Sequence, residues 1–190
     1  MIGLFGGAFN PPHYGHVELA RRALDEFDLD KLLVLVSDDP GHKEVECPFE
    51  ERLALARLAF ADLPRTEVIA DPYRYTIDRL RAEPVEDGIF LMGADQYRDF
   101  PTWKDPEAVL DTVRVGVATR EGVDRSPVRP EDEGRVQLFE IDSPPISSRD
   151  LRERARRGES LEGLVPPGVA REIEKRGLYG YTAPATAQES

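Results

Sequence analysis

Cysteine, long apolar runs and positive charge are all scarce in this sequence. The 190 residues include one cysteine, Cys47, which excludes an internal disulfide and any cysteine metal cluster. No apolar stretch approaches the length that spans a membrane, and the sequence starts with a strand-like segment instead of a signal peptide. We therefore expect an intracellular, cytoplasmic protein.

Acidic residues outnumber basic residues by 37 to 25, which gives a formal net charge of −12. General nucleic-acid binders usually present a basic face, so this balance argues against that class of protein. A site for an anionic small molecule must instead be locally positive. Lysine occurs at four positions only, and arginine carries most of the positive charge. The fixed fork of donors on arginine suits phosphate and carboxylate groups.

Apolar and amphipathic segments alternate along the chain. Hydrophobic residues make up 40% and charged residues 33%, a balance that suits one soluble domain of this length. Buried strands are expected at residues 1–5, 31–36, 66–70, 89–92, 113–118 and 136–141, and helices at residues 17–27, 49–63, 76–81, 105–110, 148–157 and 167–176. The alternation predicts an α/β protein with a doubly wound, Rossmann-like parallel sheet and helices on both faces. We expect one domain over residues 1–180 and a frayed tail over residues 181–190.

A glycine-rich turn follows the first expected strand. Gly6 and Gly7 let the backbone turn sharply and approach a ligand closely, because neither carries a Cβ. The next helix begins shortly afterwards, and a helix N-terminus that points at such a loop favours an anion. The loop lacks the Gly-Lys-Ser/Thr end of a Walker loop and the G-x-G-x-x-G of a dinucleotide fold. By themselves, the glycines are typical of a structural turn.

Two histidines, His13 and His16, stand about one helical turn apart at the end of this loop. Pro11 and Pro12 precede them and stiffen the segment. The histidines either flank a helix start without further role or hold a charged ligand there. The whole string of residues 6–16 favours phosphate chemistry.

Residues 146–152, Ile-Ser-Ser-Arg-Asp-Leu-Arg, form a second informative segment. Ser147 and Ser148 precede an expected helix, so one of them can cap it while the helix N-terminus faces an anion. Arg149 and Arg152 are three residues apart and can share one face of that helix. Alone, the segment is typical of a capped, arginine-rich surface helix.

Gly93 and Asp95 follow the fourth expected strand. An aspartate at this point can accept a hydrogen bond from a ribose hydroxyl or an adenine amine, although a strand-ending turn explains it equally well. Residues 100–103, Phe-Pro-Thr-Trp, come shortly afterwards and contain the single tryptophan, Trp103. A lone tryptophan belongs more often to a core or an interface than to a ligand site.

Together, these segments resemble a known family. Residues 6–16 are similar to the G-x-F-[DN]-P-x-H-x-G-H element of the nucleotidylyltransferase superfamily, and residues 146–152 are similar to its I-S-S-T-x-x-R element. Asp95 followed by Phe-Pro-Thr-Trp, the Tyr75-Thr76 pair and the ending over residues 164–179 resemble bacterial nicotinate mononucleotide adenylyltransferases in particular. The resemblance extends over residues 1 to about 180.

The resemblance implies an enzyme that transfers the adenylyl group of ATP to nicotinate mononucleotide, with deamido-NAD and pyrophosphate as products, in NAD biosynthesis. It implies catalytic roles for His13, His16 and Arg152. The ATP-binding residues that it implies are Gly6, Gly7, Ala8, Phe9, His13, His16, Gly93, Asp95, Ile146, Ser147, Ser148 and Arg152. The acceptor-binding residues that it implies are His42, Lys43, Tyr75, Thr76 and Trp103. Mg²⁺ that bridges the ATP phosphates is the expected cofactor, and it rarely needs a full set of protein ligands.

Three positions depart from the family pattern. Asn10 replaces the commoner aspartate and removes one negative charge beside the phosphates. Gly41 replaces the second proline of a P-P-H-[KR] segment, which the family follows with an arginine on the next helix, here Arg52. Arg149 stands where the family usually has threonine, so that a guanidinium can take the place of a hydroxyl contact.

Other functions stay open from the sequence. A sister adenylyltransferase could use nicotinamide mononucleotide, phosphopantetheine or another phosphorylated acceptor. Class I aminoacyl-tRNA synthetases have similar histidines, but this short acidic chain offers no obvious tRNA-binding domain. A non-catalytic module could bind ATP without turning it over. We expect ATP and nicotinate mononucleotide as partners, without nucleic acid or membrane. The preference for acid over amide and the oligomeric state do not follow from the sequence.

Overall fold

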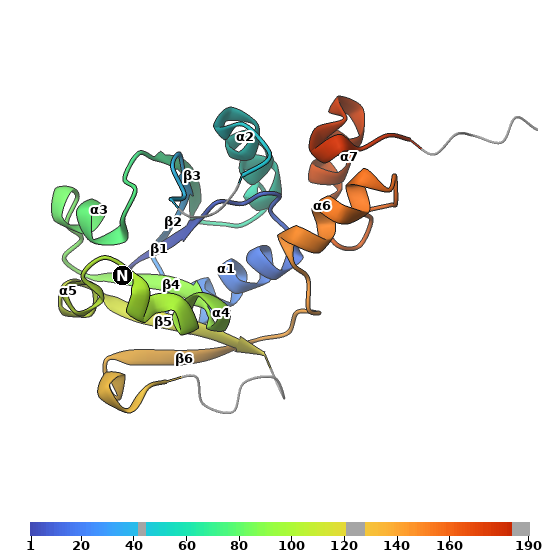
Figure 1. The fold of residues 1–190 in the computed structure, drawn as a ribbon. Coiled ribbons are helices and arrows are strands. Elements are labelled where there is room, and N and C mark those ends of the chain that lie inside the picture. Colours follow the sequence, from blue (N-terminus) through green and yellow to red (C-terminus); the bar gives the residue numbers. More distant parts are fainter. Residues whose placement is uncertain (42–44, 121–127, 184–190) are drawn as a thin grey trace, which may run out of the picture.

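The computed structural model describes residues 1–41, 45–120 and 128–183. In these residues, six strands form one sheet in the order β3-β2-β1-β4-β5-β6 (Figure 1). The strands are β1 (Ile2–Gly7), β2 (Lys31–Ser37), β3 (Thr66–Asp71), β4 (Gly88–Gly93), β5 (Arg114–Arg120) and β6 (Val136–Ile141). Every neighbouring pair in the sheet is parallel, which confirms the predicted doubly wound α/β fold.

The chain reverses its direction across the sheet at β1. It proceeds outward from β1 through β2 to β3, and then returns to place β4 on the other side of β1. Open parallel sheets bind ligands beyond the carboxyl ends of their strands at such a reversal. Gly7 ends β1 and Gly93 ends β4, so the two glycine-containing loops of the sequence both leave the sheet at this point.

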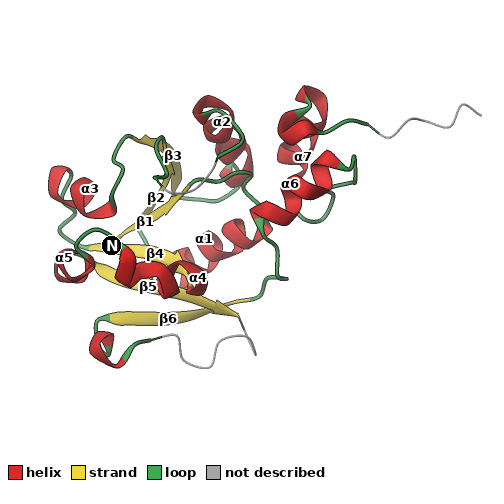
Figure 2. Ribbon diagram, viewed as in Figure 1, coloured by secondary structure: helices red, strands yellow, loops and turns green. Residues whose placement is uncertain are grey.

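Helices connect the strands and cover both faces of the sheet (Figure 2). The α-helices of the described residues are α1 (Tyr14–Glu26), α2 (Phe49–Phe60), α3 (Thr76–Ala82), α4 (Ala94–Asp99), α5 (Pro106–Thr112), α6 (Ser148–Arg156) and α7 (Pro167–Arg176). Single 3₁₀ turns occur at η1 (Phe100–Thr102), η2 (Pro130–Asp132) and η3 (Leu178–Gly180). The last two helices, α6 and α7, lie beyond the carboxyl ends of the strands (Figure 1).

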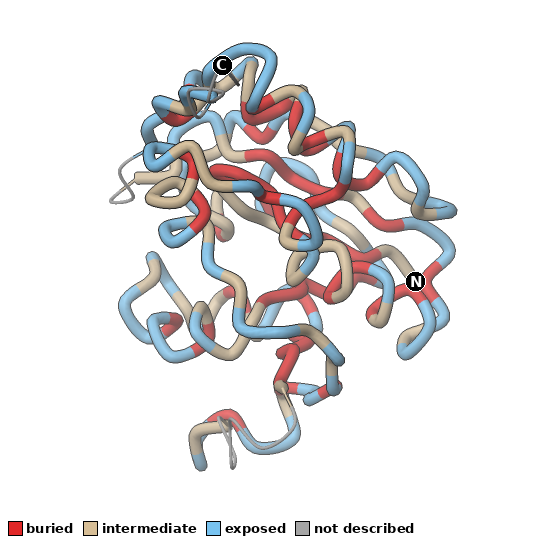
Figure 3. Tube along the Cα trace, turned by 90° about the vertical axis from the view of Figure 1, so that its right-hand side faces the viewer, coloured by how far each residue is buried: buried red, intermediate tan, exposed pale blue. Residues whose placement is uncertain are grey.

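Two apolar clusters fill the space between the sheet and its helices. One contains residues of α1, α2, α6 and α7, such as Leu24 and Phe60. The other contains residues of α3, α4 and α5, such as Ile77 and Val109. The buried segments run through the middle of the molecule in Figure 3. Because a fully buried large apolar side chain contributes about 1.5–3 kcal/mol, both helical layers depend on the sheet between them.

Some element boundaries differ from the expectations of the sequence analysis. Helix α1 begins at Tyr14 instead of residue 17, so His16 lies within the helix and not before it. Helix α2 ends at Phe60 instead of residue 63. Helix α4 was not expected, because its six residues are too few to show a helical period. The connection between β5 and β6 contains η2, and residues 121–127 of this connection lie outside the described residues.

No helix in the described part of the chain is both long and apolar enough to cross a bilayer. Most of the expected C-terminal tail, residues 184–190, lies outside the described residues. The described chain ends just after η3, which packs against α6 and α7.

Candidate active site

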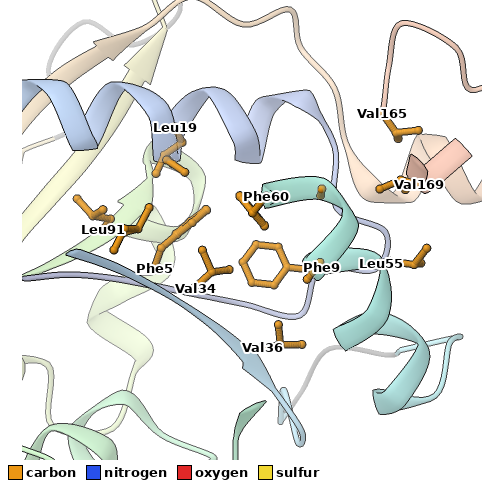
Figure 4. Packing of buried hydrophobic residues seen from close by; sticks show 14 of the residues in the cluster. Phe5, Phe9, Leu19, Val34, Val36, Leu55, Phe60, Leu91, Val165 and Val169 are labelled. Carbon is orange, nitrogen blue, oxygen red and sulfur yellow. The ribbon is translucent and has the colours of Figure 1, made fainter. Parts of the chain in front are cut away.

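The loop after β1 is held in place by Phe9. This residue adopts a backbone φ of 48°, a conformation that is strained for a bulky side chain. Its ring is buried and lies 5.4 Å from the ring centroid of Phe5 and 5.6 Å from that of Phe60. Figure 4 shows the ring pointing into the apolar cluster between the sheet and α2. Packing of Phe9 thus compensates the backbone strain and fixes the loop above the sheet.

Gly7 shows why this turn needs glycine. A Cβ built on Gly7 would lie 3.0 Å from the Phe9 ring, closer than nearly all real contacts of that kind. A side chain at position 7 would therefore push the anchoring ring out of place. Together, Gly7 and Phe9 bring the loop backbone to the carboxyl end of β1.

Arg52 fastens the same loop from behind. Its guanidinium is buried and donates to the backbone carbonyl oxygens of Ala8 and Ser37, each at 2.8 Å. It also donates to the carbonyl oxygens of Cys47 at 3.2 Å and Asp38 at 3.3 Å. The family pattern has an arginine at this place on the helix, and in the structure Arg52 does not line the site cavity. Its role here is to tie the β1–α1 loop to the β2–α2 connection.

His13 and His16 lie face to face at the start of α1. Their ring centroids are 3.7 Å apart, and the rings are inclined by 28°. His13 is the N-cap residue of the helix, and its backbone N–H donates to Nδ1 of His16 at 3.2 Å. Because Nδ1 of His16 accepts this bond, it carries no proton, and the proton of the neutral ring lies on Nε2. The cap therefore fixes both the position and the tautomer of His16.

Burial keeps His13 neutral. The side chain is buried, and this loss of solvent, helped by the positive charge of Arg120, lowers the pKa of His13 to about 4. Nδ1 of His13 and Oδ1 of Asn10 are buried polar atoms that have no hydrogen-bond partner in the described residues. Such atoms cost about 1–3 kcal/mol each and often mark functional sites.

The N-terminus of α6 meets the β1–α1 loop. The Ser147 side chain caps α6 by accepting a hydrogen bond from the backbone N–H of Asp150 at 3.1 Å. Ser148 Oγ donates to the carbonyl oxygen of Pro11 at 2.8 Å, and Arg152 Nη1 donates to that of Asn10 at 2.9 Å. The expected cap is thus confirmed, and two side chains of α6 hold the loop that carries the histidines.

A cavity of about 890 Å³ opens where these segments meet. Its lining includes every residue that the resemblance implies for ATP, namely Gly6, Gly7, Ala8, Phe9, His13, His16, Gly93, Asp95, Ile146, Ser147, Ser148 and Arg152. His16 and Arg152 therefore line the same cavity, although they are far apart in the sequence. A volume of this size is typical of small-molecule sites.

Asp95 lies in the first turn of α4, at the edge of the cavity. Its carboxylate pairs with Arg98 at 3.3 Å and with Arg120 at 3.8 Å. Gly93, and not Asp95, is the N-cap residue of α4, so Asp95 is not the capping residue of a plain turn. Its side chain is largely exposed.

Four charged residues that the sequence analysis did not assign to the site also line the cavity. Arg120 ends β5, Arg156 ends α6, Glu153 lies on α6, and Glu46 lies in the connection between β2 and α2. Arg120 carries a signal in the sequence, because it is the charged residue at the end of an apolar strand. The sequence contains no signal that marks Glu46, since it is one acidic residue among other polar residues of a loop.

Three of the residues expected to bind the acceptor can be compared with this cavity. Trp103 packs edge-on against Phe90 at 6.0 Å and Phe100 at 5.3 Å between ring centroids, so it belongs to the apolar cluster under α4 and α5. Tyr75 is the N-cap residue of α3 and is partly exposed, and Thr76 is the first residue of that helix. Neither Trp103, Tyr75 nor Thr76 lines the cavity. His42 and Lys43 lie outside the described residues.

Two ion pairs connect the segments that lie next to Trp103 and Tyr75. Lys104, next to Trp103, binds Asp78 on α3 at 2.9 Å and lies 4.9 Å from the ring centroid of Tyr75. Arg74 binds Asp39 of the β2–α2 connection at 3.1 Å. The segments of Tyr75 and Trp103 are therefore neighbours.

The described residues contain no group of three or more His, Cys, Asp or Glu side chains that could hold a metal ion by themselves. Mg²⁺ usually keeps several waters and binds through substrate phosphates, so such a group is not needed for a metal that arrives with a nucleotide. The arginines and neutral histidines of the cavity suit the phosphates of such a complex.

Comparison with known proteins identifies the family to which this chain is similar. The family model described as Cytidylyltransferase-like matches residues 4–154. The chain is 35% identical to a probable nicotinate-nucleotide adenylyltransferase of Chlorobium luteolum, over 94% of this chain and 97% of the relative. It is 36% identical to a protein of the same name from Thermus thermophilus, over 94% of this chain and 98% of the relative.

Among solved structures, the fold is similar to that of the Plasmodium falciparum nicotinic acid mononucleotide adenylyltransferase complexed with NaAD, with a TM-score of 0.80. The two chains are 16% identical, and the similarity covers 95% of this chain and 98% of that chain. At this level of identity, the structural similarity supports the assignment of the fold alone.

Proposed function

The chain belongs to the nicotinate-nucleotide adenylyltransferases of the cytidylyltransferase-like family, and we propose that it transfers the adenylyl group of ATP to nicotinate mononucleotide. The observation that carries this proposal is the convergence of the β1–α1 loop and the α6 N-terminus on one cavity. Both segments match family elements, and they are brought together from opposite ends of the chain.

In this reaction, a phosphate oxygen of nicotinate mononucleotide attacks the α-phosphorus of ATP. The bond from that phosphorus to the oxygen that bridges the α- and β-phosphates breaks, and pyrophosphate leaves with the electron pair. The attacking group is already an anion, so the reaction needs no strong general base. Catalysis then depends on alignment of the two phosphates and on stabilisation of negative charge as it moves to the leaving group.

His16 is the residue that we assign to the α-phosphate. Its Nδ1 accepts the backbone N–H of His13, which fixes the direction in which Nε2–H points. His13 stacks on it and stays neutral, because its pKa is lowered to about 4 by burial. A neutral neighbour avoids repulsion between two stacked cations, and the pair can donate to phosphate oxygens without changing its charge.

The α6 N-terminus and Arg152 are assigned to the leaving pyrophosphate. Backbone N–H groups at a helix N-terminus favour an anion, and a guanidinium adds a full positive charge. Arg152 already donates to the Asn10 carbonyl, so its position relative to the histidine loop is set before substrate binds. Ile146, Ser147 and Ser148 complete this end of the cavity.

Asp95 and Gly93 are assigned to the nucleoside part of ATP, and Tyr75, Thr76 and Trp103 to the acceptor, together with His42 and Lys43. The contact between Lys104 and the Tyr75 ring, next to Trp103, supports a common acceptor region for the two aromatic residues.

For the metal, we propose that Mg²⁺ enters with ATP. When bound with the nucleotide, Mg²⁺ would supply partial neutralisation of the phosphate charge. The arginines and histidines of the cavity would hold the phosphate groups of that complex.

Release of pyrophosphate tests this function directly. Purified protein is given ATP and Mg²⁺ with nicotinate mononucleotide, with nicotinamide mononucleotide or with no acceptor. We expect rapid release with the first, slower release with the second, and almost none without an acceptor. Faster turnover with the amide would assign the chain to a sister activity. Binding of ATP without release in any mixture would make it a non-catalytic nucleotide-binding module.

A further inference from the structure

Glu46 lies between two arginines of the pyrophosphate end of the cavity. Its Oε1 accepts from Nε of Arg152 at 3.0 Å, and its Oε2 forms an ion pair with Arg156. All three side chains line the cavity. Both oxygens of one carboxylate are therefore held by two guanidinium groups inside the proposed ATP site.

The arginines that line the cavity follow one face of α6. Arg149, Arg152 and Arg156 are spaced by three and four residues, which brings their side chains to the same side of the helix. The family element extends only as far as Arg152. Arg156 continues the row by one more helical turn and doubles the positive charge that faces Glu46.

The two arginines form an anion site, and the Glu46 carboxylate occupies it. A carboxylate with two arginines has the chemistry of a phosphate group with two arginines, and planar guanidinium groups suit both. Partial burial raises the pKa of Glu46, but the hydrogen bonds from Arg156 and Arg152 outweigh this effect, so the pKa lies below its usual value. Glu46 is thus negatively charged at neutral pH.

The contacts of Glu46 are also exchangeable. The side chains of Glu46 and Arg156 are 36% and 47% exposed, so water screens the ion pair between them, whereas Arg152 is 16% exposed and its pair with Glu46 is screened less. Pyrophosphate carries more negative charge than one carboxylate and can contact both arginines at once. It can therefore displace Glu46, at the cost of the two ion pairs.

We propose that Arg156 is a further pyrophosphate-binding residue of this chain and that Glu46 is a built-in competitor for the same arginines. The inference rests on the proposed function, because it takes the polyphosphate of ATP and the product pyrophosphate as the anions. Its consequence is that the chain binds pyrophosphate less tightly than its arginines alone would, which favours product release.

Calorimetric binding of inorganic pyrophosphate to the full chain, without acceptor, tests the proposal. Replacement of the competitor, Glu46→Gln, keeps the size of the side chain and should tighten binding by about fivefold. Arg156→Gln should weaken binding by a similar factor, about fivefold. When Arg156→Gln is already present, Glu46→Gln should tighten pyrophosphate binding by less than it does in the wild type. One of the two arginines that lose their carboxylate partner is then absent.

Glu159 provides a matched control. It also pairs with two arginines, Arg157 at 2.5 Å and Arg154 at 3.5 Å, but none of these three residues lines the cavity. Glu159→Gln and Arg157→Gln make the same changes in net charge as the two test variants. We expect the affinity for pyrophosphate to stay at the wild-type value in both.

Unchanged or weaker binding in Glu46→Gln would overturn the proposal, as would tightening of equal size in Glu159→Gln, which would indicate a general charge effect. Absence of pyrophosphate binding in both the wild type and Glu46→Gln would overturn it as well. These results are separate from the proposed function. Turnover with nicotinate mononucleotide can persist when Glu46→Gln has no effect, and the competition can exist in a protein that binds polyphosphate but transfers no adenylyl group.

Discussion

The ATP region and the acceptor region of this molecule are built in different ways. The ATP candidates come from loops that are fixed by buried groups, such as the Phe9 ring in the apolar cluster and the Arg52 guanidinium behind Ala8. The acceptor candidates come from separate segments that exposed ion pairs connect, such as Arg74 with Asp39 and Lys104 with Asp78.

This difference has a consequence for recognition. Buried contacts resist change, because their loss leaves cavities or unpaired polar groups. Exposed ion pairs contribute at most about 1 kcal/mol and are easily replaced. We therefore expect changes in the ATP region to affect every reaction of the protein strongly, and changes in the acceptor region to have small effects that depend on the acceptor.

The largest effect is expected at Arg52, which connects the two regions. Arg52→Met removes hydrogen bonds to the carbonyl oxygens of Ala8, Ser37 and two other residues, and each buried oxygen left unpaired costs free energy. We expect a loss of about 3 kcal/mol or more in the free energy of unfolding. Urea denaturation measures it. Arg57→Met, an exposed site on the same helix, is the control and should stay within about 0.5 kcal/mol of the wild type. Equal stability of the two variants would remove the proposed role of Arg52.

In the ATP region, His16 should matter most for turnover. His16→Ala removes the donor to the α-phosphate and should reduce kcat by roughly two orders of magnitude with every acceptor. His16→Asn keeps a short acceptor for the His13 backbone N–H but loses Nε2, so its stability should be close to that of the wild type and its kcat as low as that of His16→Ala. Pyrophosphate release and urea denaturation separate the two properties. Near-normal turnover in either variant would contradict the assignment.

Acid should destabilise the ATP region through His13. The pKa of His13 is about 4 in the folded protein and 6.5 in an ordinary exposed histidine, so only the unfolded chain binds a proton between these values. The stabilisation from neutral His13 is therefore complete above pH 6.5 and is lost as the pH falls toward 4. Between pH 6.5 and about pH 5, this amounts to about 2 kcal/mol.

The measurement is the free energy of unfolding against pH for the wild type and for His13→Asn, which cannot titrate. The wild type should lose more stability over this range, and the difference between the two curves isolates His13 from the other titrating groups. Parallel curves would show that His13 is not buried as a neutral group.

The smallest effect is expected in the acceptor region. Tyr75→Ala should raise the KM for nicotinate mononucleotide by about fivefold, in line with the loss of one exposed aromatic contact of about 1 kcal/mol, and leave the KM for ATP unchanged. Tyr75→Phe keeps the ring over which Lys104 lies and should behave like the wild type. Steady-state kinetics with each substrate varied in turn tests both variants. A rise in the KM for ATP would show that the two regions are not separate.

Local patterns in the sequence were enough to predict the parallel sheet, its helical layers and the order of the loops that line the cavity. Apolar runs and amphipathic periods are properties of neighbouring residues, and the expected strands were observed with shifts of one or two residues at their ends. The cap at Ser147 was also predicted, because capping involves only the first turn of a helix. Helix α4 was missed since six residues give too little pattern to detect.

Tertiary structure alone decided which charged groups share the site. Glu46 and Arg152 are 106 residues apart, and the sequence around each of them does not predict that they are in contact. Arg52 could be recognised as part of the family pattern, but only the packing of α2 against the sheet shows that it is buried beneath the loop. Trp103 could be a ligand platform or a core residue, and the structure packs it against Phe90 and Phe100. These outcomes depend on how whole helices dock on the sheet, and docking is set by the sum of many distant contacts that no short stretch of sequence contains.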